Sequence, residues 1–170
     1  MPGSPSSTAL PTCLSWKMGA ASRRCPQALI CSVSYLLDTN AVIALLRNNP
    51  PGVRDRLRLV VSRGASVAVS SIVLYELWYG VARSERRREN AERLRVLLSG
   101  NIAVVPFAEE DAMAAGDLRA ALERAGTPVG PYDLLIAAQA RRSGTTLVTA
   151  NVSEFSRVDG LVWQDWTATD

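Results

Sequence analysis

Short apolar runs alternate with longer segments of helical periodicity through most of this chain, and this alternation limits the folds that it can form. Strands that are apolar almost throughout and are separated by helices are typical of a parallel sheet covered on both faces. The sequence therefore predicts an α/β fold with a parallel five-stranded sheet flanked by helices. The strands are expected at 35–37, 67–69, 102–105, 146–148 and 161–163, and the helices at 40–48, 51–63, 71–83, 85–99, 108–125 and 132–143.

The first 32 residues differ in composition from the rest of the chain, because prolines lie among Ser, Gly and Ala without a helical or strand period. We expect a disordered extension at 1–32 and one domain at 33–170, a length at which a single core is usual. The change at Val33 suggests that the natural product begins there or at Met18, which the intact mass of the natively expressed protein would test. The cysteines, for which we expect no disulfide framework, are Cys13, Cys25 and Cys31.

The predicted domain lacks most of the side chains that enzymes use for catalysis. The chain has no histidine, and its one lysine, Lys17, lies in the extension with the three cysteines. Histidine acid/base chemistry, catalytic thiols, Schiff-base lysines and Cys/His zinc sites are therefore excluded from 33–170. An enzyme built from the remaining carboxylates, hydroxyls, amides and arginines is expected to hold a hard divalent cation through acidic side chains.

The net charge of +3 comes from the extension, which carries three of the 19 basic residues and none of the 16 acidic ones. Affinity for nucleic acid must then come from the distribution of the arginines and from bound metal, not from a net field. No apolar run approaches the roughly 18 residues of a membrane span, and no secretory signal is recognisable, so we expect a cytoplasmic protein without membrane contact.

Three acids stand where ligands are expected to bind, because the loops after parallel strands meet at one edge of the sheet. Asp38 ends the first strand, Glu76 lies one turn into the helix after the second strand, and Asp133 opens an apolar helix. Asp38 has a structural alternative as a helix cap, and Asp133 as an acid favoured by the helix dipole. Glu76, on an otherwise apolar helical surface, needs a partner.

The three carboxylates need a cation if they converge. At about 4 Å each pair repels by roughly 4 kcal/mol at an effective dielectric constant near 20, and a domain is stable by only ~5 to 15 kcal/mol. No arginine falls within the three stretches that carry these acids. We therefore expect Mg²⁺, or Mn²⁺, because ligands that are all oxygen favour these ions over zinc. Asn151 and Glu154 follow the fourth strand and offer further oxygens.

Other notable side chains have structural explanations. The acids at 109–111 crowd the first turn of a predicted helix, where its dipole favours negative charge. Asp117 follows in the same helix and either faces solvent or leans toward the site. Trp78 and Tyr79 are expected in the core or in an interface and not as a platform for stacking bases.

Three stretches stand in order along residues 34–166: "YLLDTNAVIALL", "SSIVLYELWYG" and "GTPVGPYDLLIAAQARRSGTTLVTANVSEFSRVDGLVWQDW". Together they closely resemble the PIN-domain ribonuclease toxins of the VapC type, from bacterial VapBC toxin-antitoxin modules. The resemblance implies a three-layer PIN-like fold and Mg²⁺- or Mn²⁺-dependent hydrolysis of phosphodiester bonds in RNA. It also implies attack by water that leaves a 5′-phosphate, since no histidine is available.

The resemblance also assigns roles to single positions. Asn151 stands at a fourth position that is acidic in many relatives, and its neutral oxygen would hold a metal less strongly unless Glu154 compensates. The metal-binding and catalytic acids would be Asp38, Glu76 and Asp133. The polar positions beside them would be Thr149, Thr39 and Asn40.

The resemblance implies two protein partners, a second copy in a homodimer and an antitoxin of the VapB type. The antitoxin would dock near the acids, and the apolar helix at 71–83 offers a receiving surface. The expected surface residues are Leu74, Leu77, Trp78 and Val81.

Two other functions are compatible with part of this pattern. A weakly active or inactive PIN domain, suggested by Asn151, would act mainly as a binding partner in an antitoxin-DNA complex. A phosphatase of the aspartyl-phosphate type would need a second acid two residues after Asp38, where the chain has Asn40, and a lysine in the domain. The sequence therefore favours the ribonuclease.

Overall fold

The computed structural model describes residues 33–168, and their strands form the parallel sheet that the apolar runs predict. The strand order is β3-β2-β1-β4-β5, and every neighbouring pair is parallel. The predictions for residues 1–32, including the disordered extension and the cysteines, lie outside the described residues. The strands are β1 (Tyr35–Leu37), β2 (Val67–Ser70), β3 (Ile102–Val105), β4 (Thr146–Val148) and β5 (Trp163–Gln164).

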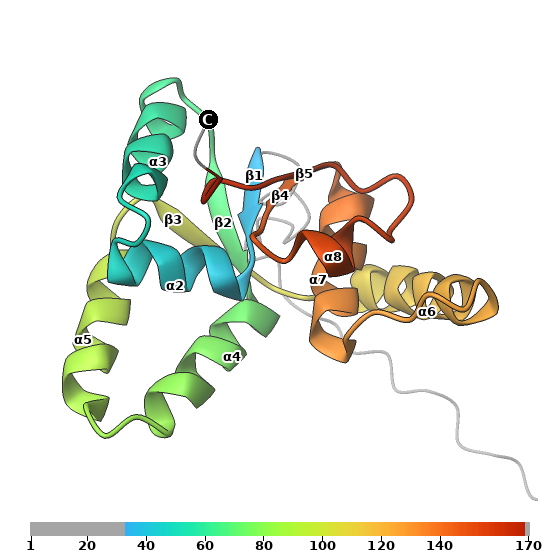
Figure 1. Cartoon of the computed structure of the whole chain (residues 1–170), viewed down its shortest axis with the longest axis horizontal. Helices are drawn as coiled ribbons and strands as arrows, with labels where there is room; N and C mark the ends of the chain where they lie inside the picture. The colour runs from blue at the N-terminus through green and yellow to red at the C-terminus, as the bar shows by residue number, and fades with distance from the viewer. Residues whose placement is uncertain (1–32, 169–170) are drawn as a thin grey trace, which may run out of the picture.

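Helices cover both sides of this sheet. In Figure 1, α2, α3 and α5 lie to the left of the strands and α6, α7 and α8 to the right, with α4 below. The arrangement matches the three-layer fold expected from the sequence. None of the helices within 33–168 is long and apolar enough to cross a membrane. The helices are α2 (Thr39–Arg47), α3 (Gly52–Ser62), α4 (Ser71–Ala82), α5 (Arg87–Leu98), α6 (Glu109–Arg124), α7 (Pro131–Ser143) and α8 (Val152–Phe155).

The strand order brings the ends of three strands together. Strand β1 lies at the centre, and its last residue, Leu37, pairs with Val69 of β2 on one side and Val148 of β4 on the other. The residues that follow these strands therefore lie side by side. The chain order reverses between β1 and β4, and such a switch point is where ligands bind in open α/β sheets.

Two short elements near the C-terminus differ from the sequence prediction. Strand β5 begins at Trp163, two residues after the start of the weak apolar run at 161–163, and ends at Gln164. Helix α8 was not predicted, because its four residues are too few to show a helical period.

Asp111, one of the acids in the first turn of α6, has a structural role that goes beyond the expected dipole effect. Its side chain is fully buried and accepts hydrogen bonds from Ala108 N, Gln139 Nε2 and Arg142 Nε at 2.8, 3.0 and 2.6 Å. The last two donors belong to α7. Asp111 therefore joins α6 to α7, the helix that carries Asp133.

We expect Asp111→Ala to lower the free energy of unfolding by roughly 2 kcal/mol, because it removes hydrogen bonds to a buried charged group. Asp117→Ala in the same helix is the matched control, since Asp117 is exposed and surface changes shift stability by less than about 0.5 kcal/mol. Urea denaturation of both variants measures the difference. Equal stabilities would show that the buried network contributes little.

Candidate metal centre

Asp38 caps α2 and also lies near the other two acids, so the capping role does not exclude a role at the candidate site. Its Oδ1 accepts a hydrogen bond from Ala41 N at 2.6 Å, as an N-cap does. Its Oδ2 accepts from Thr149 Oγ1, also at 2.6 Å. The side chain is 2% exposed, because Asp38 follows the central strand and its own N–H donates to Val148 O.

Burial and like charges work against the ionised form of Asp38. Burial is the main reason that its pKa rises from 3.8 to about 6, and the negative charges of Asp133 and Glu76 raise it further. The hydrogen bonds from Thr149 and Ala41 oppose this rise. The three acids therefore lie close enough for their charges to interact, although they come from different parts of the chain.

Glu76 is positioned by Thr39, the neighbour of Asp38. Ser70 caps α4 by accepting from Ile72 N at 3.2 Å, which places Glu76 in the second turn of the helix. Thr39 Oγ1 donates to Glu76 Oε2 at 2.5 Å. The half-buried carboxylate thus has the partner that the sequence argument required, and this partner is a neutral hydroxyl.

Asp133 lies in the first turn of α7, which begins at Pro131. Proline suits this first position, because a backbone N–H there would have no partner within the helix. Burial is the main cause that raises the pKa of Asp133, and the charges of Glu76 and Glu154 add to it. A hydrogen bond from Asn151 Nδ2 to Asp133 Oδ2, 2.9 Å long, opposes the rise.

Asn151 and Glu154 use their side chains differently from what the sequence suggests. The amide nitrogen of Asn151 faces Asp133, because an ionised carboxylate can only accept, and its Oδ1 accepts from Ser153 Oγ. Glu154 Oε2 accepts from Gly130 N at 3.1 Å, just before α7. Asn151 therefore supports Asp133 directly, and Glu154 holds the turn that precedes α7.

Thr149 links the two halves of the site. Its hydroxyl donates to Asp38 and accepts from Asn151 N at 2.9 Å, and Asn151 in turn donates to Asp133. Glu76 joins through Thr39, which follows Asp38 directly in the chain. One connected set of hydroxyl, amide and carboxylate groups thus runs across the ends of β1 and β4.

The donor set fits a hard divalent cation. None of the ion pairs found among residues 33–168 involves Asp38, Glu76 or Asp133. Within the same residues, no three acids lie close enough to form a ready cage around an ion. Mg²⁺ does not require such a cage, because it is usually bound by one or two carboxylates and keeps several waters.

Two of the predicted polar residues lie apart from this network. Asn40 is exposed in the first turn of α2, and among the described residues its side chain forms no hydrogen bond. Asp117 is exposed in α6, and its charge is not among those that raise the pKa of Asp38 or Asp133.

The expected antitoxin surface on α4 is wrong in part. Leu77 is 6% exposed and Val81 is 9% exposed, so both belong to the hydrophobic core. Helix α4 is apolar on several sides because it packs against α2, α5 and α7. Its exposed residues include two aromatics, Tyr75 and Tyr79.

The sequence argument missed the aromatic rim of the site. Tyr75 and Tyr132 directly precede Glu76 and Asp133, and their ring centroids lie 5.7 Å apart. Tyr79 stacks on Tyr75 at 6.4 Å, and all three rings are about half exposed. The shared position, one residue before each acid, was a signal available in the sequence.

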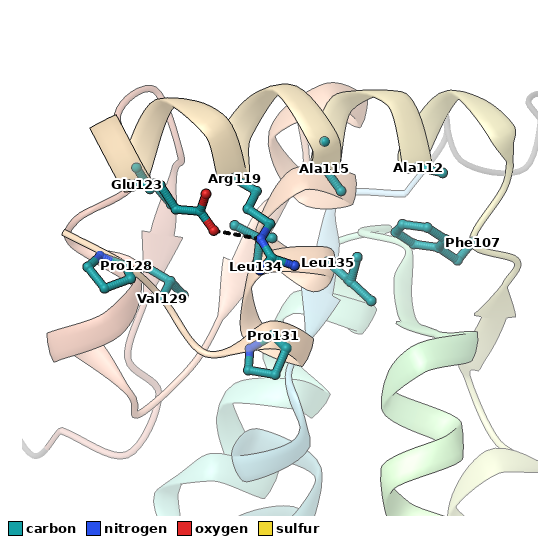
Figure 2. A pocket seen from close by; sticks show the side chains of 12 residues that line it. Phe107, Ala112, Ala115, Arg119, Glu123, Pro128, Val129, Pro131, Leu134 and Leu135 are labelled. Carbon is teal, nitrogen blue, oxygen red and sulfur yellow. Dashed lines mark hydrogen bonds and ion pairs between the residues drawn. The ribbon is translucent and has the colours of Figure 1, made fainter. Parts of the chain in front are cut away.

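The cavity between α6 and α7 is not part of this centre. It has a volume of about 570 Å³ and is lined mainly by apolar side chains, with the Arg119–Glu123 ion pair at its edge (Figure 2). Pro131 and Leu134 line it, but Asp133 between them does not. The chemistry of the carboxylates therefore belongs to the ends of β1 and β4.

Comparison with known proteins identifies the family of this chain. Residues 35–161 match the family model of the PIN domain. Ribonuclease VapC2 of Rickettsia felis is 36% identical over 132 residues, which cover 78% of this chain and 97% of the relative. The tRNA(fMet)-specific endonuclease VapC of Salmonella typhimurium is 38% identical over 134 residues, which cover 79% of this chain and 98% of the relative.

Solved structures extend the likeness to three dimensions. The complex VapBC2 from Rickettsia felis, bound to a DNA fragment from its promoter, contains a chain with a TM-score of 0.74 and 35% identity. DNA-bound VapBC from Salmonella typhimurium gives a TM-score of 0.73 at 38% identity. The alignments cover 79% of this chain and 99% and 98% of those chains. This protein therefore belongs to the PIN domain family, and within it to the ribonuclease toxins of the VapC type.

Proposed function

We propose that this protein is the toxin of a type II toxin-antitoxin pair and hydrolyses phosphodiester bonds in RNA, with Asp38, Glu76 and Asp133 as its catalytic acids and Mg²⁺ as its cation. Mn²⁺, with the same preference for oxygen ligands, is expected to replace Mg²⁺. The proposal rests on one observation. Among residues 33–168, three carboxylates without a basic partner belong to one network of hydrogen-bonded side chains at the switch point of the sheet.

Asp38 and Asp133 would hold the cation, with Glu76 as a further ligand or as the group that orients the attacking water. Such a cation supplies positive charge where negative charge develops on the phosphate, and it makes water a better nucleophile. Thr149 and Asn151 hold one oxygen each of Asp38 and Asp133. Their hydroxyl and amide thereby fix the direction of the remaining acceptor positions.

Glu76 is the best-placed group to orient the water. The Thr39 hydroxyl holds Oε2, and Oε1, which has no hydrogen-bond partner among residues 33–168, can accept a hydrogen bond from the nucleophile. The water oxygen attacks phosphorus, the bond to the 3′-oxygen breaks, and the products are a 5′-phosphate and a 3′-hydroxyl. The water loses its proton to the Glu76 carboxylate, and solvent water gives a proton to the leaving 3′-oxygen.

The experiment that tests this function uses the purified protein, free of antitoxin, with total RNA and Mg²⁺. We expect discrete cleavage that EDTA abolishes and that added Mg²⁺ or Mn²⁺ restores. We also expect products that a 5′-phosphate-dependent exonuclease degrades. Products with a cyclic phosphate, or cleavage that persists in EDTA, would contradict the mechanism.

An antitoxin partner is proposed because the similar solved chains belong to VapBC complexes. The apolar groove between α2, α3 and α5 is a better receiving surface than α4. It has a volume of about 1090 Å³, and large apolar side chains from these three helices line it. These are Leu46, Leu57, Val61, Val96 and Leu97. The homodimer stays a prediction, which light scattering of the purified toxin tests.

The second candidate function is binding without cleavage. Asn151 supports it, because an amide replaces a possible fourth carboxylate and points its nitrogen toward Asp133. The VapBC complexes on promoter DNA provide a role for such a protein beside its antitoxin. Absence of RNA cleavage by folded protein with Mg²⁺ present would favour this function.

A further inference from the structure

A separate pocket begins at Glu76 and extends between α2, α4 and α5. Thr39 and Glu76 line one part of it, and Arg47 and Arg93 line another. Thr39 and Arg47 stand at opposite ends of α2, and eight residues of helix span about 12 Å. The volume of about 370 Å³ falls in the range of small-ligand pockets, ~300–1,000 Å³.

The lining combines an apolar wall with polar groups at its edge. The amide nitrogen of Asn90 donates to Ser84 Oγ at 2.7 Å, which fixes both side chains. Glu76 is the one acid in the lining, and it belongs to the proposed metal centre. The apolar wall consists of Ile43, Leu46, Leu77 and Val81.

The two arginines give the far part of the pocket a positive charge. Arg47 is exposed and forms no ion pair among residues 33–168, while Arg93 shares Glu89 with Arg86. Guanidinium groups match the geometry of phosphate oxygens. A ligand that reaches from the metal centre to Arg47 thus meets a cation at one end, an apolar wall and an amide along its length, and positive charge at the other.

We propose that this pocket binds one nucleotide of single-stranded RNA next to the scissile phosphate, with its base against the apolar wall and the following phosphate on Arg47 and Arg93. The inference rests on the proposed ribonuclease function, whose metal centre the pocket adjoins. A single strand is required, because only an unstacked base can leave its neighbours and enter a pocket. A nucleotide within an RNA strand has a phosphate on each side, so its binding requires positive charge at both ends of the pocket.

Gly80 supports this assignment and offers a sharp variant. It lies within α4, where glycine is less favourable than alanine by about 1 kcal/mol. It lines the pocket, and an added Cβ would meet no other atom within 4 Å. A side chain is therefore sterically tolerated at this position, and we expect a large one to narrow the pocket that Gly80 lines. Gly80→Leu should fill the pocket without disturbing the core.

Fluorescence anisotropy of a labelled single-stranded RNA, measured with the antitoxin-free protein in EDTA, tests the pocket without any cleavage. We expect Arg47→Gln with Arg93→Gln to weaken binding about tenfold and to lower the salt slope by about 0.7, since the two arginines share one phosphate and each phosphate contact contributes roughly 0.7 on single strands. Arg56→Gln with Arg63→Gln, two exposed arginines outside the pocket, is the matched control and should bind as the wild type does.

Gly80→Leu provides the second readout, and its melting temperature and circular dichroism report that it folds. We expect it to raise KM for RNA about tenfold with kcat nearly unchanged, because it removes binding that is equal in ground and transition states. RNA affinity and KM equal to wild type in both pocket variants would overturn the proposal while wild-type cleavage left the ribonuclease intact. Loss of binding in the pocket variants, with a wild type that never cleaves, would support the pocket and reject the ribonuclease.

Discussion

Asp38→Asn is expected to lower RNA cleavage by at least about 100-fold, because even groups that only support metal ligands change activity by ~10- to 100-fold when they are replaced. The variant keeps the shape of the side chain and its cap on α2, since asparagine caps helices as well as aspartate does. It removes the negative charge that would hold the cation. The rate of cleavage of one defined RNA at saturating Mg²⁺ measures the effect.

Asp117→Asn is the matched control for this substitution. It makes the same chemical change at an exposed position of α6 whose charge does not reach Asp38 or Asp133. We expect full cleavage by this variant. A loss in Asp117→Asn equal to that in Asp38→Asn, or full activity in both, would place the catalytic acids elsewhere in the chain.

A variant of Thr149 distinguishes, in the same assay, a group that positions a metal ligand from a group that binds the metal. Thr149 is buried and donates to Asp38, so Thr149→Val removes the hydrogen bond but leaves every carboxylate in place. Its effect should therefore be smaller than that of Asp38→Asn, and higher Mg²⁺ should recover part of it. An effect as large as that of Asp38→Asn, unaffected by Mg²⁺, would assign Thr149 a direct role in the reaction.

The fold was predictable because its signals are local. Each of the runs at 35–37, 102–105 and 146–148 became a strand with the predicted bounds, since short, wholly apolar segments between helical patterns have few other solutions. Helix α8 and the start of β5 were not predictable in the same way. Their residues carry no period, and their conformation depends on contacts with α7 and β4.

The positions of the proposed acids in the fold could be predicted from the sequence, but their hydrogen bonds could not. Asp38, Glu76 and Asp133 follow from strand ends and helix starts, which the sequence reveals. That Thr39 holds Glu76 and that Asn151 presents its nitrogen to Asp133 depends on side-chain directions, which do not follow from sequence spacing. Which other residues lie near the acids depends on how α2, α4 and α5 pack together. The sequence does not reveal this packing, so it did not predict the pocket that leads to Arg47.

The raised pKa of Asp38 makes a further prediction, that the protein in EDTA loses stability as the pH rises from about 4 to about 6. In this window the folded state keeps a proton on Asp38 that the unfolded state, with a pKa near 3.8, has released. The folded state therefore binds more protons, and its stability must fall with rising pH, by about 3 kcal/mol for this one group. The raised pKa of Asp133 acts in the same direction.

Urea denaturation of wild type and Asp38→Asn across this pH range isolates the effect, because the variant has no carboxyl at position 38 to titrate. We expect the wild type to lose about 3 kcal/mol relative to the variant between pH 4 and pH 7 in EDTA. Mg²⁺ at neutral pH should stabilise the wild type more than the variant, because an ion that binds only the folded state raises its stability. Parallel pH profiles of wild type and variant would mean that burial and neighbouring charges do not raise the pKa of Asp38. Equal stabilisation of both by Mg²⁺ would mean that the Asp38 carboxylate does not bind the cation.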